Sequence, residues 1–184
     1  MEQLLQETED ITTAPIDPAH ELRSLNADQL LERWKAGTVP DTIRMLDGDP
    51  RGLGIALHIL TGSWFERWLK RYSLKETFPW HGKSFRSTSD TEGWGWNRIA
   101  IGPILDIFPF KTRIGTSAVD GKQSIILDFN VPRNPWWERL TWDELREVEP
   151  GVFLGLTTLR LFGRQPIMLW FAVDTTRDSE WHGA

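Results

Sequence analysis

The chain has 184 residues, enough for one domain with a substantial core or for one domain with an added helical segment. A hydrophobic fraction of 40% and a charged fraction of 26% are typical of a globular protein, and a net charge of −5 with no Lys/Arg cluster argues against nucleic acid as a partner. The chain has no cysteine, which excludes disulfides, thiolate catalysis and cysteine-based zinc sites and fits a reducing compartment.

The N-terminal residues 1–16 are polar and acidic, and we expect them to form a flexible arm. They lack the charged-then-apolar layout of a signal peptide. No run in the chain reaches the roughly 18–20 apolar residues of a membrane span. We therefore expect a cytoplasmic protein without a membrane span.

Residues 17–78 are predicted to form a helical cap. Asn26 can cap a helix over 27–36 because Gln29 follows three residues later, and Gly37 ends it. Asp49 and Pro50 are typical of a helix start and predict a longer helix over 50–73. Its apolar residues recur at steps of three and four: Leu53, Leu57, Leu60, Trp64 and Trp68.

After Pro79 the hydrophobic period changes to two, which predicts strands. The dipeptides Asp120-Gly121 and Pro150-Gly151 mark turns between neighbouring strands. About seven strands joined by short turns indicate an antiparallel meander, and such a meander can close into a barrel. We therefore predict an α+β chain whose β-barrel spans 79–176, followed by a polar tail at 177–184. The predicted strands are 82–89, 92–101, 110–119, 122–130, 143–149, 152–161 and 166–174.

The segment EGWGWNR (92–98) is part of an unusual aromatic composition, with eleven Trp and one Tyr. In a strand, Trp94, Trp96 and Arg98 share one face, and the opposite face carries two glycines and an asparagine. Such a strand can contribute to a packed core, or it can form the wall of a cavity. We favour the cavity wall.

Three segments in chain order resemble a known family. They are LLERWKAGTVP (30–40), FPWHGKSF (78–85) and DELREVEPGVFLG (143–155). Together they are similar to motifs of small bacterial proteins named for a Gly-x-Trp-x-Gly signature. The resemblance implies a helical front and a lipocalin-like barrel of the calycin type, and it says little about activity.

The aromatic residues of the strands favour a cavity for a hydrophobic or aromatic small molecule, because such sites combine apolar walls with few polar groups. The alternative is that the rings are simply the core. The candidate ligand-binding residues are Trp80, His81, Lys83, Phe85, Trp94, Trp96, Arg98, Phe129 and Trp170.

Charged residues in the strands suggest an alternative, a cofactor-independent cyclase, isomerase or lyase acting on an apolar metabolite. Asp128 or Glu144 serves as the base in this hypothesis, and Arg98 or Arg146 stabilises negative charge. A buried carboxylate needs a basic partner. Each of these charges can equally belong to a structural ion pair at the barrel end or to exposed surface.

The four histidines lack the spacing of a metal pair, and the chain contains no phosphate loop, nucleophile elbow or dinucleotide fingerprint. We therefore expect no metal and no cofactor. Haem stays open as an alternative, since a single histidine can ligate it, and His81 beside Trp80 is the candidate.

The segment VPRNPWWERLTW (131–142) is too rich in proline for a strand. It can fold over the barrel as a lid, and loops of this length are often functional. Because tryptophan is enriched at interfaces, it can also serve as a contact surface in an assembly protein or a homo-oligomer. This segment is called the tryptophan loop below.

Overall fold

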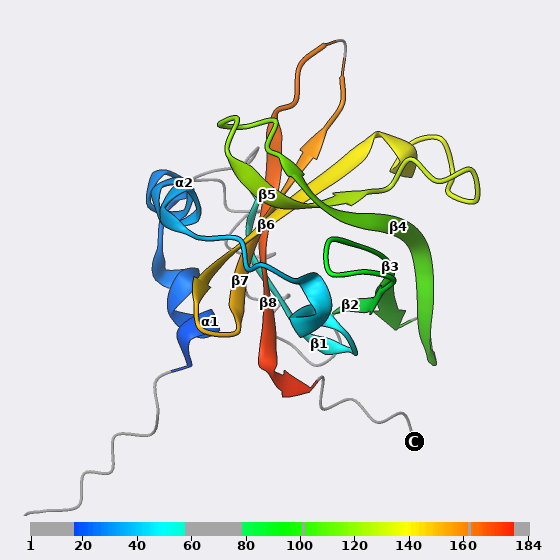
Figure 1. Cartoon of the computed structure of the whole chain (residues 1–184), viewed down its shortest axis with the longest axis horizontal. Helices are drawn as coiled ribbons and strands as arrows, with labels where there is room; N and C mark the ends of the chain where they lie inside the picture. Colours follow the sequence, from blue (N-terminus) through cyan, green and yellow to red (C-terminus); the bar gives the residue numbers. More distant parts are fainter. Residues whose placement is uncertain (1–16, 58–78, 101, 162, 179–184) are drawn as a thin grey trace, which may run out of the picture.

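The described residues fold into a closed barrel of eight antiparallel strands with short helices on its outer side (Figure 1). The computed structural model describes residues 17–57, 79–100, 102–161 and 163–178. The strands are β1 (Pro50–Leu57), β2 (Trp80–Ser87), β3 (Glu92–Ala100), β4 (Ile104–Thr116), β5 (Gln123–Asp128), β6 (Thr141–Glu149), β7 (Val152–Leu159) and β8 (Ile167–Asp178). The helices are α1 (Pro18–Glu21) and α2 (Ala27–Ala36), and the 3-10 turns are η1 (Leu22–Ser24), η2 (Ile43–Leu46) and η3 (Glu138–Leu140).

Each strand pairs with the next along the chain, and β1 pairs with β8 to close the barrel. This confirms the predicted lipocalin-like antiparallel barrel. All seven predicted strands are present with modest shifts at their ends, because their period-two patterns and turn residues are local signals. Gly121 and Gly151 have φ of 73° and 76°, the left-handed region that favours glycine at tight turns. No helix in the described parts of the chain is long and apolar enough to cross a membrane.

The eighth strand, β1, lies where we predicted the start of the helix over 50–73. That prediction is wrong over Pro50–Leu57, and the rest of the predicted helix lies outside the described residues. Leu53 and Ile55 also fit a period of two, and both are buried. Six residues of β1 from Arg51 on pair with β8, which closes the gap between β2 and β8. The barrel therefore begins inside the segment assigned to the helical cap.

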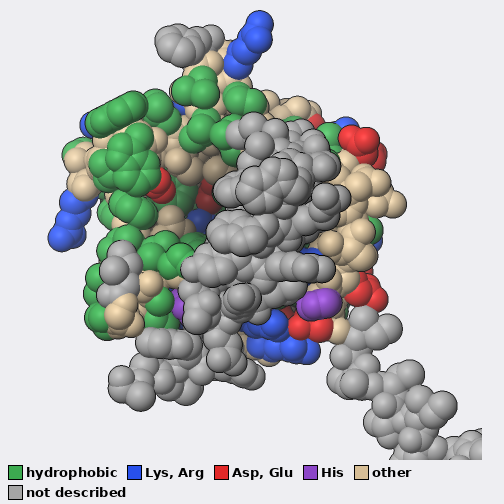
Figure 2. Space-filling view, turned by 180° about the vertical axis from the view of Figure 1, so that it is seen from behind, with side chains coloured by type: hydrophobic (Ala, Val, Ile, Leu, Met, Phe, Trp, Pro, Cys, Tyr) green, Lys and Arg blue, Asp and Glu red, His purple; other side chains and the backbone are tan. Residues whose placement is uncertain are grey.

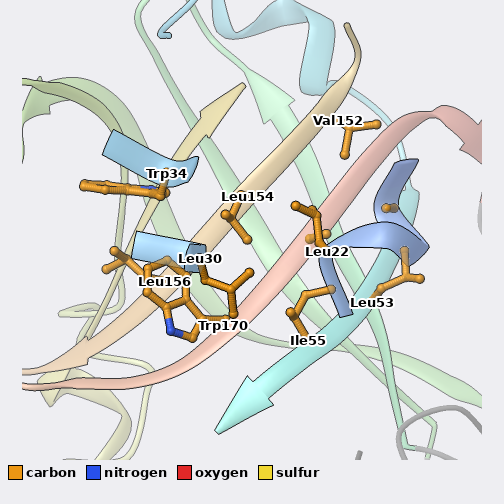
Figure 3. Close-up of a cluster of buried hydrophobic side chains, with 11 residues drawn as sticks. Leu22, Leu30, Trp34, Leu53, Ile55, Val152, Leu154, Leu156 and Trp170 are labelled. Atoms are coloured by element: carbon orange, nitrogen blue, oxygen red, sulfur yellow. The ribbon is translucent and has the colours of Figure 1, made fainter. Parts of the chain in front are cut away.

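The short helices cover the outer face of β1, β7 and β8. The predicted helix over 27–36 is confirmed as α2, with a capping box formed by Asn26 and Gln29. Leu30 and Trp34 of α2 pack into an apolar cluster on the outside of the barrel wall (Figure 3). This outer cluster consists of Ala19, Leu22, Leu30, Trp34, Leu53, Ile55, Val152, Leu154, Leu156, Trp170 and Ala172.

A second apolar cluster fills the inside of the barrel, and η2 lies against one of the barrel's ends. Gly48, just after η2, exchanges two backbone hydrogen bonds with Phe85, and the Ile43 amide donates to Asp90 in the β2–β3 turn. The other end, called the mouth below, is where β2 begins and β5 and β7 end. The inner cluster consists of Ile43, Leu46, Phe85, Phe110, Ile125, Leu127, Phe129, Leu145, Phe153, Phe171 and Val173.

Candidate functional site

Strand β3 presents its bare face, and not its tryptophans, to the barrel interior. Gly95 and Asn97 are buried on the inner side, whereas Trp94 is 37% exposed on the outer side. A Cβ at Gly95 would lie 2.3 Å from the Phe110 ring, so this ring fills the space that the glycine leaves. The predicted inward direction of Trp94, Trp96 and Arg98 is therefore wrong, because Phe110 from the neighbouring strand occupies the interior.

The N-terminal part of β2 brings Trp80 and Lys83 into the interior together. Alternation alone would put residues 80 and 83 on opposite faces. The pairing of β2 with β3 shifts register between Trp80 and Gly82, and Gly82 has a φ of 121°, which forms a bulge that glycine favours. Phe85 also points inward and belongs to the inner cluster.

His81 lies at this bulge and is half-buried. Burial lowers its pKa, and the nearby positive charge of Arg98 lowers that pKa further. A neutral imidazole can bind a metal ion or haem iron. The structure does not test the haem alternative, and His81 stays its candidate. Within the described residues, no three His, Asp or Glu side chains gather in a way that could hold a metal ion.

The polar centre of the interior is an ion pair between Lys83 and Asp143. The two charged groups lie 2.9 Å apart, and their side chains are 4% and 2% exposed. The Lys83 ammonium also donates to Asn97 Oδ1 at 2.8 Å, and the Trp80 indole N–H donates to the same oxygen at 3.3 Å. Thr157 donates its hydroxyl to Asp143 at 2.6 Å. Strands β2, β3, β6 and β7 thus each contribute to one network.

Four aromatic rings surround the Lys83 ammonium. The distances from Nζ to the ring centroids are 5.8 Å for Trp80, 5.2 Å for Phe110, 5.0 Å for Phe129 and 4.9 Å for Phe171. A cation within about 6 Å of an aromatic face is attracted by the ring quadrupole, so each ring stabilises the charge. These four residues are called the aromatic cage below.

The tryptophan loop adds a second carboxyl group to this region. Glu138 on η3 is 9% exposed. Burial raises the pKa of Glu138 to about 7, with a further upward contribution from the negative charge of Asp143 and an opposing one from Lys83. A carboxyl with such a pKa exists in both protonation states near neutral pH and can donate or accept a proton.

Two contacts hold the tryptophan loop against β4. The rings of Trp137 and Phe108 pack edge to face with centroids 5.4 Å apart. Phe108 has a φ of 54°, which is unusual for a residue other than glycine and marks local strain at a bulge in β4. The Asn134 side-chain amide donates to the carbonyl oxygens of Pro109 and Phe129 at 2.8 and 2.9 Å. The position of Glu138 therefore depends on an anchored loop.

Figure 2 shows that the face seen from behind is hollowed. Hydrophobic side chains border the part of the hollow that described residues form, and acidic and basic side chains are visible deeper in it. This distribution agrees with the contacts above, in which charged groups lie deep among apolar side chains. A hollow with apolar walls and a few polar groups is the usual form of a small-molecule site.

Asp128 and Glu144, the predicted bases, both point away from the interior. Asp128 forms an ion pair with Arg160 at 3.3 Å on the outer surface. Glu144 accepts hydrogen bonds from the Trp142 indole and the Ala118 amide at 3.0 and 2.8 Å. The catalytic hypothesis needs one of these carboxylates to point inward, and neither does, because the inward residues of β5 and β6 are their neighbours Leu127 and Asp143. For Asp128 the structure shows the alternative, a structural ion pair.

Arg146 and Trp170 also face outward. Arg146 donates two hydrogen bonds of 2.7 Å to Asp120 and stacks 3.8 Å from the ring centroid of Trp34. Trp170 belongs to the outer cluster beneath α2. For Arg146 the structural alternative, an ion pair, is the one that the structure shows. For Trp170 the predicted cavity wall is wrong.

Sequence reasoning placed Trp80, Lys83, Phe85 and Phe129 in one site, and the structure brings all four to the interior. It missed Asn97, Asp143, Thr157 and Glu138. A signal was available for Asp143, because Leu145 two residues later is apolar and shares its face. No such signal marks Glu138, since it lies in a loop without a period.

Comparison with known proteins finds a solved structure with a similar fold. No family model and no curated protein matches the sequence. A solved structure described as a protein from Thermomonospora curvata is similar, with 18% sequence identity, a TM-score of 0.48 and coverage of 82% of this chain and 87% of that chain. A likeness of this strength carries no argument about function. The barrel is established by the strand pairing of this chain itself.

Proposed function

We propose that this barrel binds a hydrophobic or aromatic small molecule in the mouth half of its interior. The observation that carries the proposal is the Lys83–Asp143 ion pair, which is buried among the four rings of the aromatic cage. Removing two charges from water costs several kcal/mol per ion, and replacing a buried pair with apolar residues is often neutral or stabilising. Stability alone is therefore a weak reason for placing charges here. Polar groups that orient a ligand supply a functional one.

The aromatic cage and the ion pair have separate roles in this proposal. The rings provide apolar contact area, and an aromatic side chain can bury roughly 150–250 Å². The contacts of Lys83 with Asp143 and Asn97 keep these polar side chains at fixed positions, and fixed polar groups can orient a ligand and select among ligands. Because three segments of the sequence resemble Gly-x-Trp-x-Gly-motif proteins, we also propose that those proteins have a binding site at the same place in their barrels.

Intrinsic tryptophan fluorescence with 1-octanol and 4-butylphenol as apolar ligands tests this function. We expect either ligand to shift or quench the emission of the wild-type protein. The variant Trp80→Phe should lose most of that change, because Trp80 lies in the cage. The matched variant Trp94→Phe should keep it, because Trp94 lies on the outer wall. Unchanged emission together with no heat of binding in calorimetry contradicts the proposal.

One observation favours a second function, cofactor-independent acid–base catalysis on an apolar metabolite. Glu138 has a pKa of about 7 and lies close enough to Lys83 and Asp143 for their charges to act on it. Such a group can move a proton at neutral pH, and a cyclase, isomerase or lyase needs that ability. The roles that the sequence suggested for Asp128 and Glu144 pass to Glu138 in this proposal. If a bound molecule is turned over, Glu138→Gln should abolish the turnover and spare binding of the apolar part.

Self-association through the tryptophan loop is a separate proposal. Trp136 in that loop is 75% exposed, whereas Trp142 is buried. Large exposed aromatic side chains are enriched at protein interfaces. Sedimentation of the wild type and of Trp136→Ser tests this: a larger species that the substitution dissociates supports it, and a wild-type monomer contradicts it.

A further inference from the structure

The charges at the mouth of the barrel do not balance among the described residues. Three buried charged side chains act on one another there: Lys83, Asp143 and Glu138. Lys83 carries the positive charge, and its ammonium is already committed to Asp143 and Asn97. Glu138 is thus a second carboxyl group that has no basic partner of its own in the part of the chain that the structure describes. A buried carboxylate needs a proton or a cation to offset the loss of water.

The hydrogen bonds of the same region show a matching shortage of donors. The Trp80 indole and the Thr157 hydroxyl donate to Asn97 and Asp143. On the acceptor side, the side-chain oxygen of Asn134 is buried and has no hydrogen-bond partner within the described structure. Asn134 lies in the same loop as Glu138. Among the described groups on the inner side of the wall, the unmet need is therefore for hydrogen-bond donors and positive charge.

We propose that the ligand of this site is an apolar or aromatic molecule that carries a protonated amine, with the ammonium paired to Glu138 and the apolar body against the aromatic cage. This inference rests on the proposed binding function. An ammonium supplies both a positive charge and hydrogen-bond donors, and it is attracted by aromatic faces. An alcohol supplies one donor and no charge. A carboxylate ligand would add a third negative charge beside Asp143 and Glu138, which like-charge repulsion disfavours.

The pairing makes binding depend on pH in a defined direction. The charged groups that act on Glu138 are Asp143 on β6 and Lys83 on β2, and in the free protein its pKa is about 7. An alkylammonium, with a pKa near ~10.4 as in lysine, stays charged across this range. Amine affinity therefore rises as the pH increases through about 7. Below that pH, binding releases the Glu138 proton.

Calorimetry with three ligands that share one tail separates the inference from the proposed function. The probes are octylamine, 1-octanol and sodium octanoate, titrated into the full-length protein at pH 6 and pH 8. We expect octylamine to bind at least about tenfold tighter than 1-octanol at pH 8, since hydrogen bonds to charged groups are stronger than those between neutral groups. Octanoate should bind weakest. At pH 6, titration in two buffers of different ionisation enthalpy should detect proton release with octylamine only.

A pair of variants assigns the preference to one residue. Glu138→Gln should remove the octylamine preference and leave the affinity for 1-octanol within about threefold. Glu92→Gln makes the same change at an exposed position at the start of β3, on the barrel end opposite the mouth, and should leave the preference intact. Far-UV circular dichroism confirms that both variants fold.

The outcomes separate clearly. If 1-octanol and octylamine bind equally well, or if octanoate binds tightest, the amine inference is overturned and the apolar binding function stands. A preference that survives in Glu138→Gln also overturns it. If none of the three probes binds the wild-type protein, the proposed function fails together with the inference.

Discussion

Two basic side chains are buried among the described residues, one on each side of the barrel wall, and they differ in how their surroundings satisfy them. On the outer side, Arg146 makes a two-pronged ion pair with Asp120, donates to the Gln123 carbonyl oxygen at 2.9 Å and stacks on Trp34. On the inner side, Lys83 has one carboxylate and one amide oxygen, and aromatic rings occupy the rest of its surroundings.

The comparison teaches that burial by itself does not distinguish a structural charge from one that we propose to be functional. Arg146 joins α2 to β6 and the β4–β5 turn, so its contacts explain its presence as a fold determinant. Around Lys83 lies an extra carboxyl, Glu138, which has no basic partner of its own among the described residues. The two sites differ in whether the charges and hydrogen bonds around the basic side chain are balanced, and not in the exposed fraction of Arg146 and Lys83.

The largest effect should come from Lys83→Met, measured by urea unfolding. The substitution leaves Asp143 buried without its partner, and breaking a buried pair costs about 3–5 kcal/mol. The double variant Lys83→Met/Asp143→Leu should recover most of that loss, because the aromatic cage is apolar. If the double variant is no more stable than the single one, the pair contributes to the fold as Arg146 does, and the contrast between the two sites disappears.

Arg146→Met should lower the unfolding free energy by about 3 kcal/mol, because Asp120 loses its partner and Trp34 loses its stacked guanidinium. Removing Asp120 as well should not restore stability, since the bond to Gln123 is also lost. Binding of 1-octanol should be unchanged in the folded variant. A change in its affinity would show that the outer pair is coupled to the mouth.

Gly95→Ala tests the inward direction of the bare face of β3. The new methyl group meets the Phe110 ring and the Ser84 carbonyl oxygen at 2.3 and 2.5 Å, and overpacking of this kind costs about 1–3 kcal/mol. Thermal unfolding measures the loss. The control Trp94→Ala on the outer wall should lower the stability less than Gly95→Ala does. If Trp94→Ala lowers it more, the tryptophans of β3, and not its glycines, face the interior.

The last comparison is the pH dependence of stability at the two sites. The pKa of Glu138 is raised in the folded state from its usual 4.5 to about 7, so stability falls as pH rises across that window. Hydrogen bonds from Arg146 lower the pKa of Asp120 to about 2, so its contribution is complete above about pH 4 and is lost as pH falls toward 2. Urea unfolding between pH 2 and pH 8 measures both pH dependences. Glu138→Gln should remove the one near neutral pH and leave the one at acidic pH.

The strands and turns were predictable because their signals are local. The alternation after Pro79, Asp120-Gly121 and the capping box at Asn26 each involve a few neighbouring residues. β1 was not predictable in this way, because Leu53 and Ile55 fit both a helical and a strand period. Pairing with β8, more than a hundred residues away, decides between them.

The sequence by itself determined seven of the eight strands, the turns between them and that the chain can close into a barrel. Only the tertiary structure decided which face of each strand is inside. Both sides of the wall are buried beneath apolar clusters in places, so hydrophobicity does not mark the interior of β7 or β8. The bulge at Gly82 then changes the alternation in β2, and a loop carries Glu138 to the mouth. These arrangements depend on contacts between distant strands, which a pattern along one strand does not encode.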